Sequence, residues 1–296
     1  MIIAKTIEQL RAALRGQRDA RPEQHIGFVP TMGFLHEGHA SLMRRAKEEC
    51  GFAVLSIFVN PMQFGPNEDF DRYPRDAERD LRIAEQNGID VVFMPSVEEM
   101  YPNKPVTKIL ISGVTERLCG ASRPGHFDGV GLVVGKLFNL VQPDRAYFGM
   151  KDAQQVAVIE RMTEDLNIPV QIVPCETVRE SDGLALSSRN VYLSEEERGQ
   201  AVILSRTLAL AEEWVKSPGM TNRALSDKIK ESIGQAPLAD IDYAEVLTYP
   251  DLEPLNDESE LTAHEGKILV ALAVKFGRTR LIDNRLMELH GGGYHV

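Results

Sequence analysis

Along roughly the first 180 residues, short apolar runs alternate with segments of helical spacing, and this alternation limits the fold more than any other feature. The apolar runs predict strands at residues 26–29, 53–59, 90–94, 106–111, 144–148 and 170–173. Helical spacing predicts helices at residues 6–15, 39–49, 76–87, 130–141 and 153–167. Because the two patterns alternate, we expect right-handed βαβ units in an N-terminal α/β domain with a doubly wound, Rossmann-like parallel sheet.

The pattern changes after about residue 179, where helices precede strands instead of alternating with them. We expect helices at 194–216 and 221–233, then strands at 241–247, 267–276 and 278–283. Capping-box spacing marks two helix starts, Thr6 with Gln9 and Ser194 with Glu197. Gly277 predicts a hairpin between the last two strands. The expected division is a domain at 1–180, a smaller α+β C-terminal domain at 181–290 and a disordered tail at 291–296.

Charge and composition exclude several classes of protein. Lys and Arg number 33 against 44 Asp and Glu, a net charge of −11, so we expect no general nucleic-acid binding. No run of about 18 apolar residues is found, so no membrane association is expected. The first residues lack the apolar core of a signal peptide, which predicts a cytoplasmic protein. Three separated cysteines predict buried thiols rather than a disulfide framework or a zinc cluster.

One stretch, residues 28–47, has the features of an anion site. An apolar strand runs into a turn at residues 30–33, and His36 and His39 then precede a helical pattern. The first backbone N–H groups of a helix have no partners within it, and the helix dipole is positive there, so a phosphate binds well. The alternative is that the two histidines only cap the helix.

In a doubly wound sheet, ligands bind beyond the carboxyl ends of the strands. Three segments follow predicted strands, 31–39, 60–64 and 149–152, and we expect them to converge. The glycines at 129, 131 and 135 match neither a dinucleotide fingerprint nor a P-loop. The fingerprint needs its third glycine at position 134, which is Val134, and a P-loop needs Ser or Thr after Lys136, where this chain has Leu137. That stretch is interpreted as a buried helix whose glycines permit close packing.

His36-x-Gly38-His39, Lys151 and the later Ser-Ser-Arg resemble the nucleotidylyl-transferase superfamily with its HIGH-type motif. Five longer stretches narrow the resemblance to the pantothenate synthetase (pantoate–β-alanine ligase) family: PTMGFLHEGH, SIFVNPMQFGPNEDFDRYPRD, RPGHFDGV, PDRAYFGMKDAQQ and TVRESDGLALSSRN. The resemblance implies ATP-dependent condensation of (R)-pantoate with β-alanine, through a pantoyl adenylate, to give pantothenate, AMP and diphosphate. It also implies ATP with Mg²⁺ as co-substrate, no tightly bound organic cofactor, and a homodimer.

The resemblance also implies site residues. The implied catalytic residues are His36, His39 and Lys151. The implied ATP-binding residues are Met32, Gly33, Phe34, Leu35, His36, Glu37, Gly38, His39, Gly149, Met150, Lys151, Asp152, Val178, Leu186, Ser187, Ser188 and Arg189. The implied substrate-binding residues are Gln63, Tyr73, Arg123, His126 and Gln155. The family usually has Met where this chain has Leu186, a change that a backbone or apolar contact survives.

Several alternatives stay open at this point. Lys151 could be a solvated lysine, Asp152 could cap a helix, Gln63 could be an exposed loop residue, and Arg123 and His126 could only stabilise their loop. A cytidylyl- or adenylyl-transferase, an aminoacyl-tRNA synthetase and a non-catalytic nucleotide sensor are alternative functions. The magnesium ligands are not predicted, since the sequence shows no carboxylate cluster for them. The smaller domain follows a predicted phosphate loop, which suggests a lid that excludes water from the site.

Overall fold

A computed structural model describes residues 1–66, 68 and 70–290, and the predicted tail at 291–296 lies outside the described residues. The contacts divide the chain into two compact units. Unit 1 consists of Met1–Ser112, Ser122–Met150 and Val158–Glu176. Unit 2 consists of Gly113–Ala121, Lys151–Ala157 and the chain from Thr177 onward. The domain limits expected from the sequence, 1–180 and 181–290, stay a prediction.

Unit 1 is built on a parallel sheet in the order β1-β4-β3-β2-β5-β6. Its strands are β1 Ile2–Ala4, β2 Ile26–Thr31, β3 Phe52–Ile57, β4 Val91–Phe93, β5 Arg145–Gly149 and β6 Gln171–Cys175. The central strands are almost wholly buried, as their apolar runs predict. From β2 the chain continues to β3 and β4 on one side, whereas β5 and β6 lie on the other. The doubly wound parallel sheet is therefore confirmed, with its switch point between β2 and β5.

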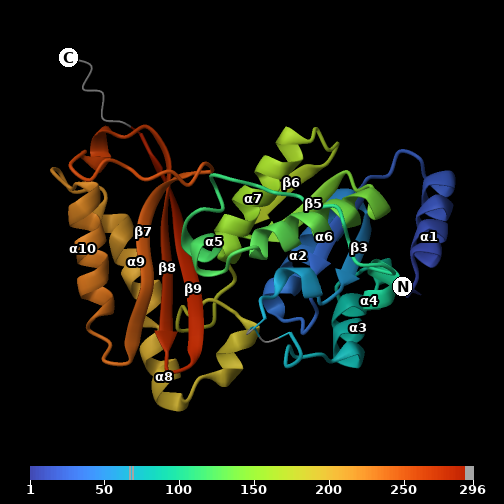
Figure 1. Cartoon of the computed structure of the whole chain (residues 1–296), viewed down its shortest axis with the longest axis horizontal. Coiled ribbons are helices and arrows are strands. Elements are labelled where there is room, and N and C mark those ends of the chain that lie inside the picture. Colours follow the sequence, from blue (N-terminus) through green and yellow to red (C-terminus); the bar gives the residue numbers. More distant parts are fainter. Residues whose placement is uncertain (67, 69, 291–296) are drawn as a thin grey trace. The chain divides into compact units, whose positions relative to one another are not determined.

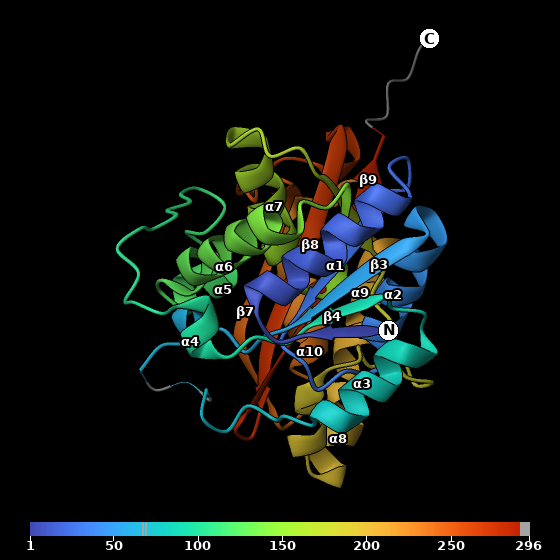
Figure 2. The same cartoon turned by 90° about the vertical axis from the view of Figure 1, so that its right-hand side faces the viewer.

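Helices cover both faces of this sheet (Figures 1 and 2). The helices that begin in unit 1 are α1 Ile7–Ala20, α2 Glu37–Cys50, α3 Ala77–Gln86, α4 Val97–Met100 and α6 His126–Val141. Two helices run across the limits of the units, α5 Leu118–Ser122 and α7 Ala153–Asp165. The capping box of Thr6 and Gln9 at the start of α1 is confirmed.

In unit 1 one strand was missed and one predicted strand does not form. Strand β1 was not predicted; it pairs in parallel with β4, and Figure 2 shows it at the N-terminus beside that strand. The predicted strand at 106–111 does not form. Its alternating apolar residues instead place Ile109 and Ile111 against the glycines of α6, where a Cβ on Gly131 would lie 3.1 Å from Ile109 Cγ2.

Unit 2 contains an antiparallel sheet, with β7 Ala239–Tyr249, β8 Gly266–Phe276 and β9 Thr279–Leu289 in that order. The predicted hairpin at Gly277 is confirmed, with Phe276 paired to Thr279 across it. Helices α9 Ile203–Trp214 and α10 Asn222–Ile233 lie along the sheet (Figure 1) and share its apolar core. The smaller α+β fold is therefore confirmed.

One helix prediction in unit 2 was wrong. The single helix expected at 194–216 is two helices, α8 Glu195–Ala201 and α9, separated at Val202. Val202 keeps right-handed dihedrals, φ −60° and ψ −19°, so the interruption is local. The capping box of Ser194 and Glu197 at the start of α8 is confirmed.

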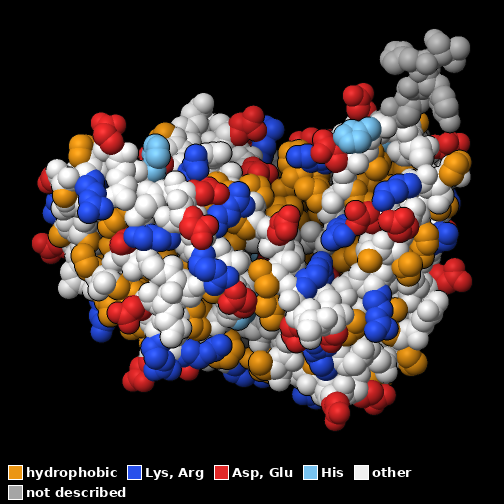
Figure 3. All heavy atoms as spheres, turned by 180° about the vertical axis from the view of Figure 1, so that it is seen from behind, with side chains coloured by type: hydrophobic (Ala, Val, Ile, Leu, Met, Phe, Trp, Pro, Cys, Tyr) orange, Lys and Arg blue, Asp and Glu red, His pale blue; other side chains and the backbone are white. Residues whose placement is uncertain are grey.

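The surface carries charges of both signs. On the face in Figure 3, Lys and Arg side chains are interspersed with Asp and Glu side chains. Within the described part of the chain, no helix is both long and apolar enough to cross a membrane.

Candidate active site

A sharp turn follows β2, ahead of α2, and Asp80 of α3 holds it. Gly33 and Phe34 have positive φ values, 85° and 50°, which only a tightly constrained turn imposes on a phenylalanine. Asp80 Oδ2 accepts a hydrogen bond from the Phe34 N–H at 2.8 Å, and Oδ1 accepts one from the Leu35 N–H at 2.7 Å. Thr31 Oγ1 accepts a third from the Gly33 N–H. Side chains of this chain therefore fix the backbone of the turn.

The pH dependence of stability should reveal Asp80. Burial raises the pKa of this carboxyl above its ordinary value, although the hydrogen bonds from Leu35 and Phe34 oppose the change. Because the folded protein then binds the proton more tightly than the unfolded chain, the contribution to stability is complete below the ordinary pKa of about 4 and is lost as pH rises through the folded pKa. The free energy of unfolding of the wild type, relative to Asp80→Asn, should therefore fall as pH rises from about 4. Urea unfolding of both proteins at a series of pH values measures this difference, and parallel pH profiles would contradict it.

Two histidines form the cap of α2. His36 is the N-cap residue, and its Nδ1 accepts a hydrogen bond from the Gly38 N–H at 3.2 Å. His39 Nδ1 accepts one from the His36 N–H, also at 3.2 Å, and the ring centroids lie 4.1 Å apart. Since each Nδ1 is an acceptor, we assign the proton of each neutral ring to Nε2. Each ring thus carries an N–H donor beside the positive end of a helix.

Both histidines do cap α2, as the alternative predicted, but this capping role is compatible with anion binding. The cap fixes the tautomer of both rings, and a fixed Nε2–H is the donor that a phosphate oxygen needs. The role of His36 and His39 toward phosphate stays a prediction.

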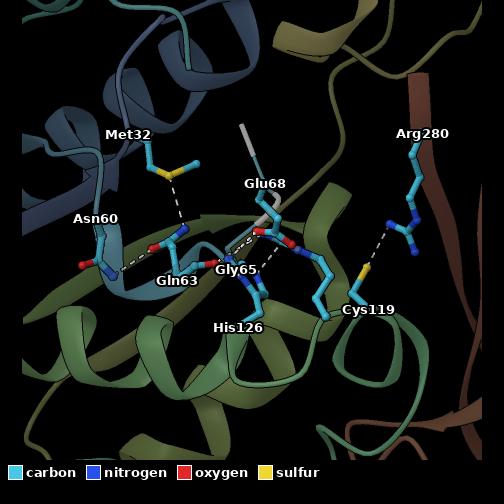
Figure 4. Close-up of polar contacts among 9 residues, drawn as sticks. Met32, Asn60, Gln63, Gly65, Glu68, Cys119, His126 and Arg280 are labelled. Atoms are coloured by element: carbon cyan, nitrogen blue, oxygen red, sulfur yellow. Dashed lines mark hydrogen bonds and ion pairs between the residues drawn. The ribbon is translucent and has the colours of Figure 1, made fainter. Parts of the chain in front are cut away.

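Gln63 is held by a hydrogen-bond network that reaches from the turn at Pro61–Gln63 to the turn after β2 (Figure 4). The residue is 8% exposed, so the exposed-loop alternative is wrong. Gln63 Oε1 accepts from Asn60 Nδ2 at 3.2 Å, and Gln63 Nε2 points at Met32 Sδ, 3.2 Å away. Asn60 also donates to the Gly129 carbonyl and accepts from the Tyr101 hydroxyl at 2.9 Å. Burial raises the pKa of Tyr101 to about 12, so this phenol remains a donor.

The backbone of Gln63 is held from α6. His126 Nδ1 lies 2.9 Å from the Gln63 carbonyl oxygen and Arg123 Nη1 lies 3.1 Å from His126 Nε2, so we assign the proton of His126 to Nδ1. Arg123 also pairs with Glu68 at 2.6 Å, and this hydrogen bond lowers the pKa of Glu68. Arg123 and His126 therefore do stabilise their loop, as the alternative predicted. Tyr73 is buried, with its ring 6.0 Å from that of Phe64.

Within unit 1, the structure brings together the turn after β2, the start of α2 and the 60–63 turn. Strand β5 runs parallel to β2, so Gly149 ends at the same edge of the sheet as Thr31. Lys151 and Asp152 belong to unit 2 by their contacts. Within unit 1, the predicted convergence of the 149–152 segment with the other two segments is therefore supported only for residues 149 and 150.

The remaining predicted site residues lie in unit 2. Lys151 and Ser187 border one small cavity of about 10 Å³. Ser187 Oγ accepts a hydrogen bond from the Arg189 N–H at 3.2 Å, and the Leu186 N–H donates to the Val178 carbonyl at 3.0 Å. Half-buried positions are taken by Lys151, Gln155, Val178, Leu186, Ser187, Ser188 and Arg189, whereas Asp152 is exposed.

The sequence predictions did not include several residues that hold these groups. Asp80, Tyr101 and Gly129 contact segments far along the chain, which no local spacing reveals, whereas Asn60 lies in the predicted 60–64 segment. The one available signal was Gly129, whose predicted close approach is confirmed. A Cβ there would lie 2.2 Å from the Met62 carbonyl oxygen.

Comparison with known proteins identifies the family. The family model described as pantoate-beta-alanine ligase matches residues 2–286. The chain belongs to that family. The resemblance inferred from the motifs is thereby confirmed, and it extends well beyond the last of those motifs, which ends at residue 190.

Relatives of pantoate-beta-alanine ligase type match over nearly the whole chain. The curated pantothenate synthetase of Pelotomaculum thermopropionicum is 54% identical over 287 residues, covering 97% of this chain and 99% of its own. The crystal structure of pantothenate synthetase from Thermus thermophilus superposes with a TM-score of 0.86 at 46% identity, covering 96% of this chain and 99% of that one. The Francisella tularensis pantoate-beta-alanine ligase, solved with beta-gamma ATP and beta-alanine, has a TM-score of 0.75 at 35% identity, with 97% of each chain covered.

Proposed function

We propose that this chain condenses (R)-pantoate with β-alanine at the expense of ATP, giving pantothenate, AMP and diphosphate. The observation that carries the proposal is the family match over residues 2–286. The side chains that the family motifs supply, including both histidines of the α2 cap, are in place in this sequence except at Leu186.

The first step makes the acid reactive. A pantoate carboxylate oxygen attacks the α-phosphorus of ATP, a new P–O bond forms, and the bond to the β-phosphate oxygen breaks. Negative charge then develops on the departing diphosphate, and preorganised donors at that place lower the barrier. The Nε2–H groups of His36 and His39, at the start of α2, are the donors we assign to this charge.

The second step forms the amide. The neutral amine of β-alanine attacks the acyl carbon of pantoyl adenylate, the C–N bond forms, and AMP leaves with the C–O bond electrons. The amine releases one proton to solvent or to a basic group. We propose that Gln63, held by Asn60 and His126, binds the hydroxy-acid portion of pantoate through an amide that both donates and accepts.

The further site residues keep the roles that the resemblance implies. Gln155 is proposed to contact pantoate, and Tyr73 to line the substrate pocket. ATP is proposed to contact the turn at 32–35, the start of α2, Gly149 to Asp152, Val178 and the loop at 186–189. Lys151 and Arg189 are proposed to bind phosphate oxygens as fixed cations.

Magnesium is proposed to arrive with ATP. Among the described residues, no group of three or more His, Cys, Asp or Glu side chains is arranged to hold a metal ion. Phosphate and water oxygens are sufficient ligands for Mg²⁺ in such complexes, so we assign the ion to the substrate rather than to the protein.

Assembly and location also stay predictions. A homodimer and a lid function for residues 181–290 are carried over from the resemblance. The cytoplasmic location is supported by three free cysteines, of which Cys50 and Cys175 are buried. Light scattering after size-exclusion chromatography tests the homodimer.

The reaction itself is tested in two stages. Protein, ATP, Mg²⁺ and pantoate are incubated first, and pantoate-dependent diphosphate is measured. β-Alanine is then added, and AMP and pantothenate are measured. Diphosphate that does not depend on pantoate would refute the proposal, and transfer of the nucleotide to a phosphate acceptor would favour the transferase alternative.

A further inference from the structure

Two adjacent residues of β9 hold two segments that are far apart in the sequence. Asp283 is 2% exposed, and its carboxylate accepts hydrogen bonds from both terminal nitrogens of Arg179, at 2.7 and 2.9 Å. Asn284 Nδ2 donates to the carbonyl oxygen of Lys151 at 2.9 Å. All four residues belong to unit 2. The strand therefore contacts both Lys151 and the start of the loop that carries Ser187.

The loop between Arg179 and Asn190 is closed on itself beyond this contact. Arg179 Nη1 also donates to the Gly183 carbonyl at 3.1 Å. Asn190 Nδ2 donates to Glu180 Oε1 at 2.9 Å and to the Ala185 carbonyl at 3.1 Å. Asp283, through Arg179, thus anchors a loop whose internal bonds are already made.

The held segments also border one space. A cavity of about 10 Å³, room for about one water molecule, is lined by side chains that include Lys151, Ser187 and Asp283. The Asn190 Oδ1 atom beside it is buried and has no hydrogen-bond partner among the residues that the structure describes. Lys151 and Ser187 therefore border the same cavity beside β9, although they are 36 positions apart in the sequence.

We propose that Asp283 and Asn284 are positioning residues that hold Lys151 and the Ser187–Arg189 loop in their ATP-binding arrangement before ATP arrives. The inference rests on the proposed function, because that function assigns ATP to these two segments. β9 is paired to β8 along its full length, so the two residues stand on a strand whose backbone is hydrogen-bonded throughout. Ordering that the strand has already imposed does not have to be supplied by ATP binding.

The proposal predicts a specific kinetic pattern. If a variant leaves the segments correctly placed in only a fraction of molecules, the apparent affinity for ATP falls by that fraction. Saturating ATP restores the arrangement, so kcat is largely kept. Asn284→Ala and Asp283→Asn should each raise the dissociation constant and the KM for ATP about tenfold, with kcat reduced less than about threefold. A purely structural role would lower the melting temperature and the active fraction without raising the KM for ATP.

The experiment uses the full chain, with ATP titrated calorimetrically and turnover measured in parallel. The matched control is Glu212→Gln, which breaks the ion pair of the next β9 residue, Arg285, with α9. Unchanged ATP affinity in Asn284→Ala, or an equal loss of ATP affinity in Glu212→Gln, would overturn the proposal. If Asp283→Asn does not fold, Asn284→Ala alone decides the test. Wild-type protein that binds ATP but makes no pantothenate would refute the proposed function only, and the titration would still decide this inference.

Discussion

Replacing His39 with Gln should slow pantoyl-adenylate formation about 10²- to 10³-fold, the effect typical of removing one preorganised donor from a developing charge. The melting temperature should change little. In the structure, His39 Nδ1 accepts the His36 N–H as the third helical residue of a capping box. Glutamine is a usual residue at that position and offers an equivalent acceptor. What the variant loses is the imidazole Nε2–H. Diphosphate release in a single turnover with pantoate, before β-alanine is added, measures the step directly.

His36→Asn provides the companion measurement. Asparagine is among the best N-cap residues, so this variant should be at least as stable as the wild type. It should nevertheless adenylate pantoate about tenfold more slowly, because one of the two donors is gone. Wild-type rates in both variants, together with unchanged stability, would leave the histidines with a capping role alone.

The buried strands of unit 1 were predictable because a strand covered on both faces needs an apolar run that is visible locally. The four runs beginning at Ile26, Ala53, Val91 and Ala146 are such cases. Helix starts were predictable for a similar reason. The capping boxes at Thr6 and Ser194 are closed by residues three positions on, so the signal and the structure share one window.

The errors arose where a distant partner decides the outcome. Residues 2–4 form a strand only because Val91–Phe93 lies beside them, and two of the three side chains are exposed. The run at 106–111 has strong strand character, yet it packs its isoleucines into the space left by glycines of α6. Strand propensity reflects packing on a pleated surface, and here a helix offers the better surface.

The same distinction applies to the candidate site. The side chains proposed to perform the chemistry stand in compact motifs, so the sequence could name them. The residues that hold them do not. Asp80 is 46 positions from Phe34, whose N–H donates a hydrogen bond to it, and Asp283 is 104 positions from its partner Arg179. Such partners depend on the folded arrangement, which a single sequence does not display.

Gly129→Ala should remove most of the activity by displacing the turn that carries Gln63. A Cβ at this position would lie 2.2 Å from the Met62 carbonyl oxygen and 2.6 Å from the Gln63 nitrogen, both of them backbone atoms. The turn at Pro61–Gln63 or α6 must therefore move, and a misplacement near 1 Å costs about 10²-fold in rate. We expect kcat/KM for pantoate to fall about 10²-fold, while overpacking destabilises the protein by about 1–3 kcal/mol.

Gly135→Ala in the same helix is the matched control. Its Cβ would meet only the end of the Ile109 side chain, at 3.1 Å, and that side chain can rotate. Alanine is also the better helix former by about 1 kcal/mol, so this variant should keep both stability and activity. Steady-state kinetics with varied pantoate and thermal unfolding of both variants separate the effects. If Gly129→Ala loses stability but keeps its kcat/KM for pantoate, the turn tolerates displacement, and Gln63 is not held in place for pantoate.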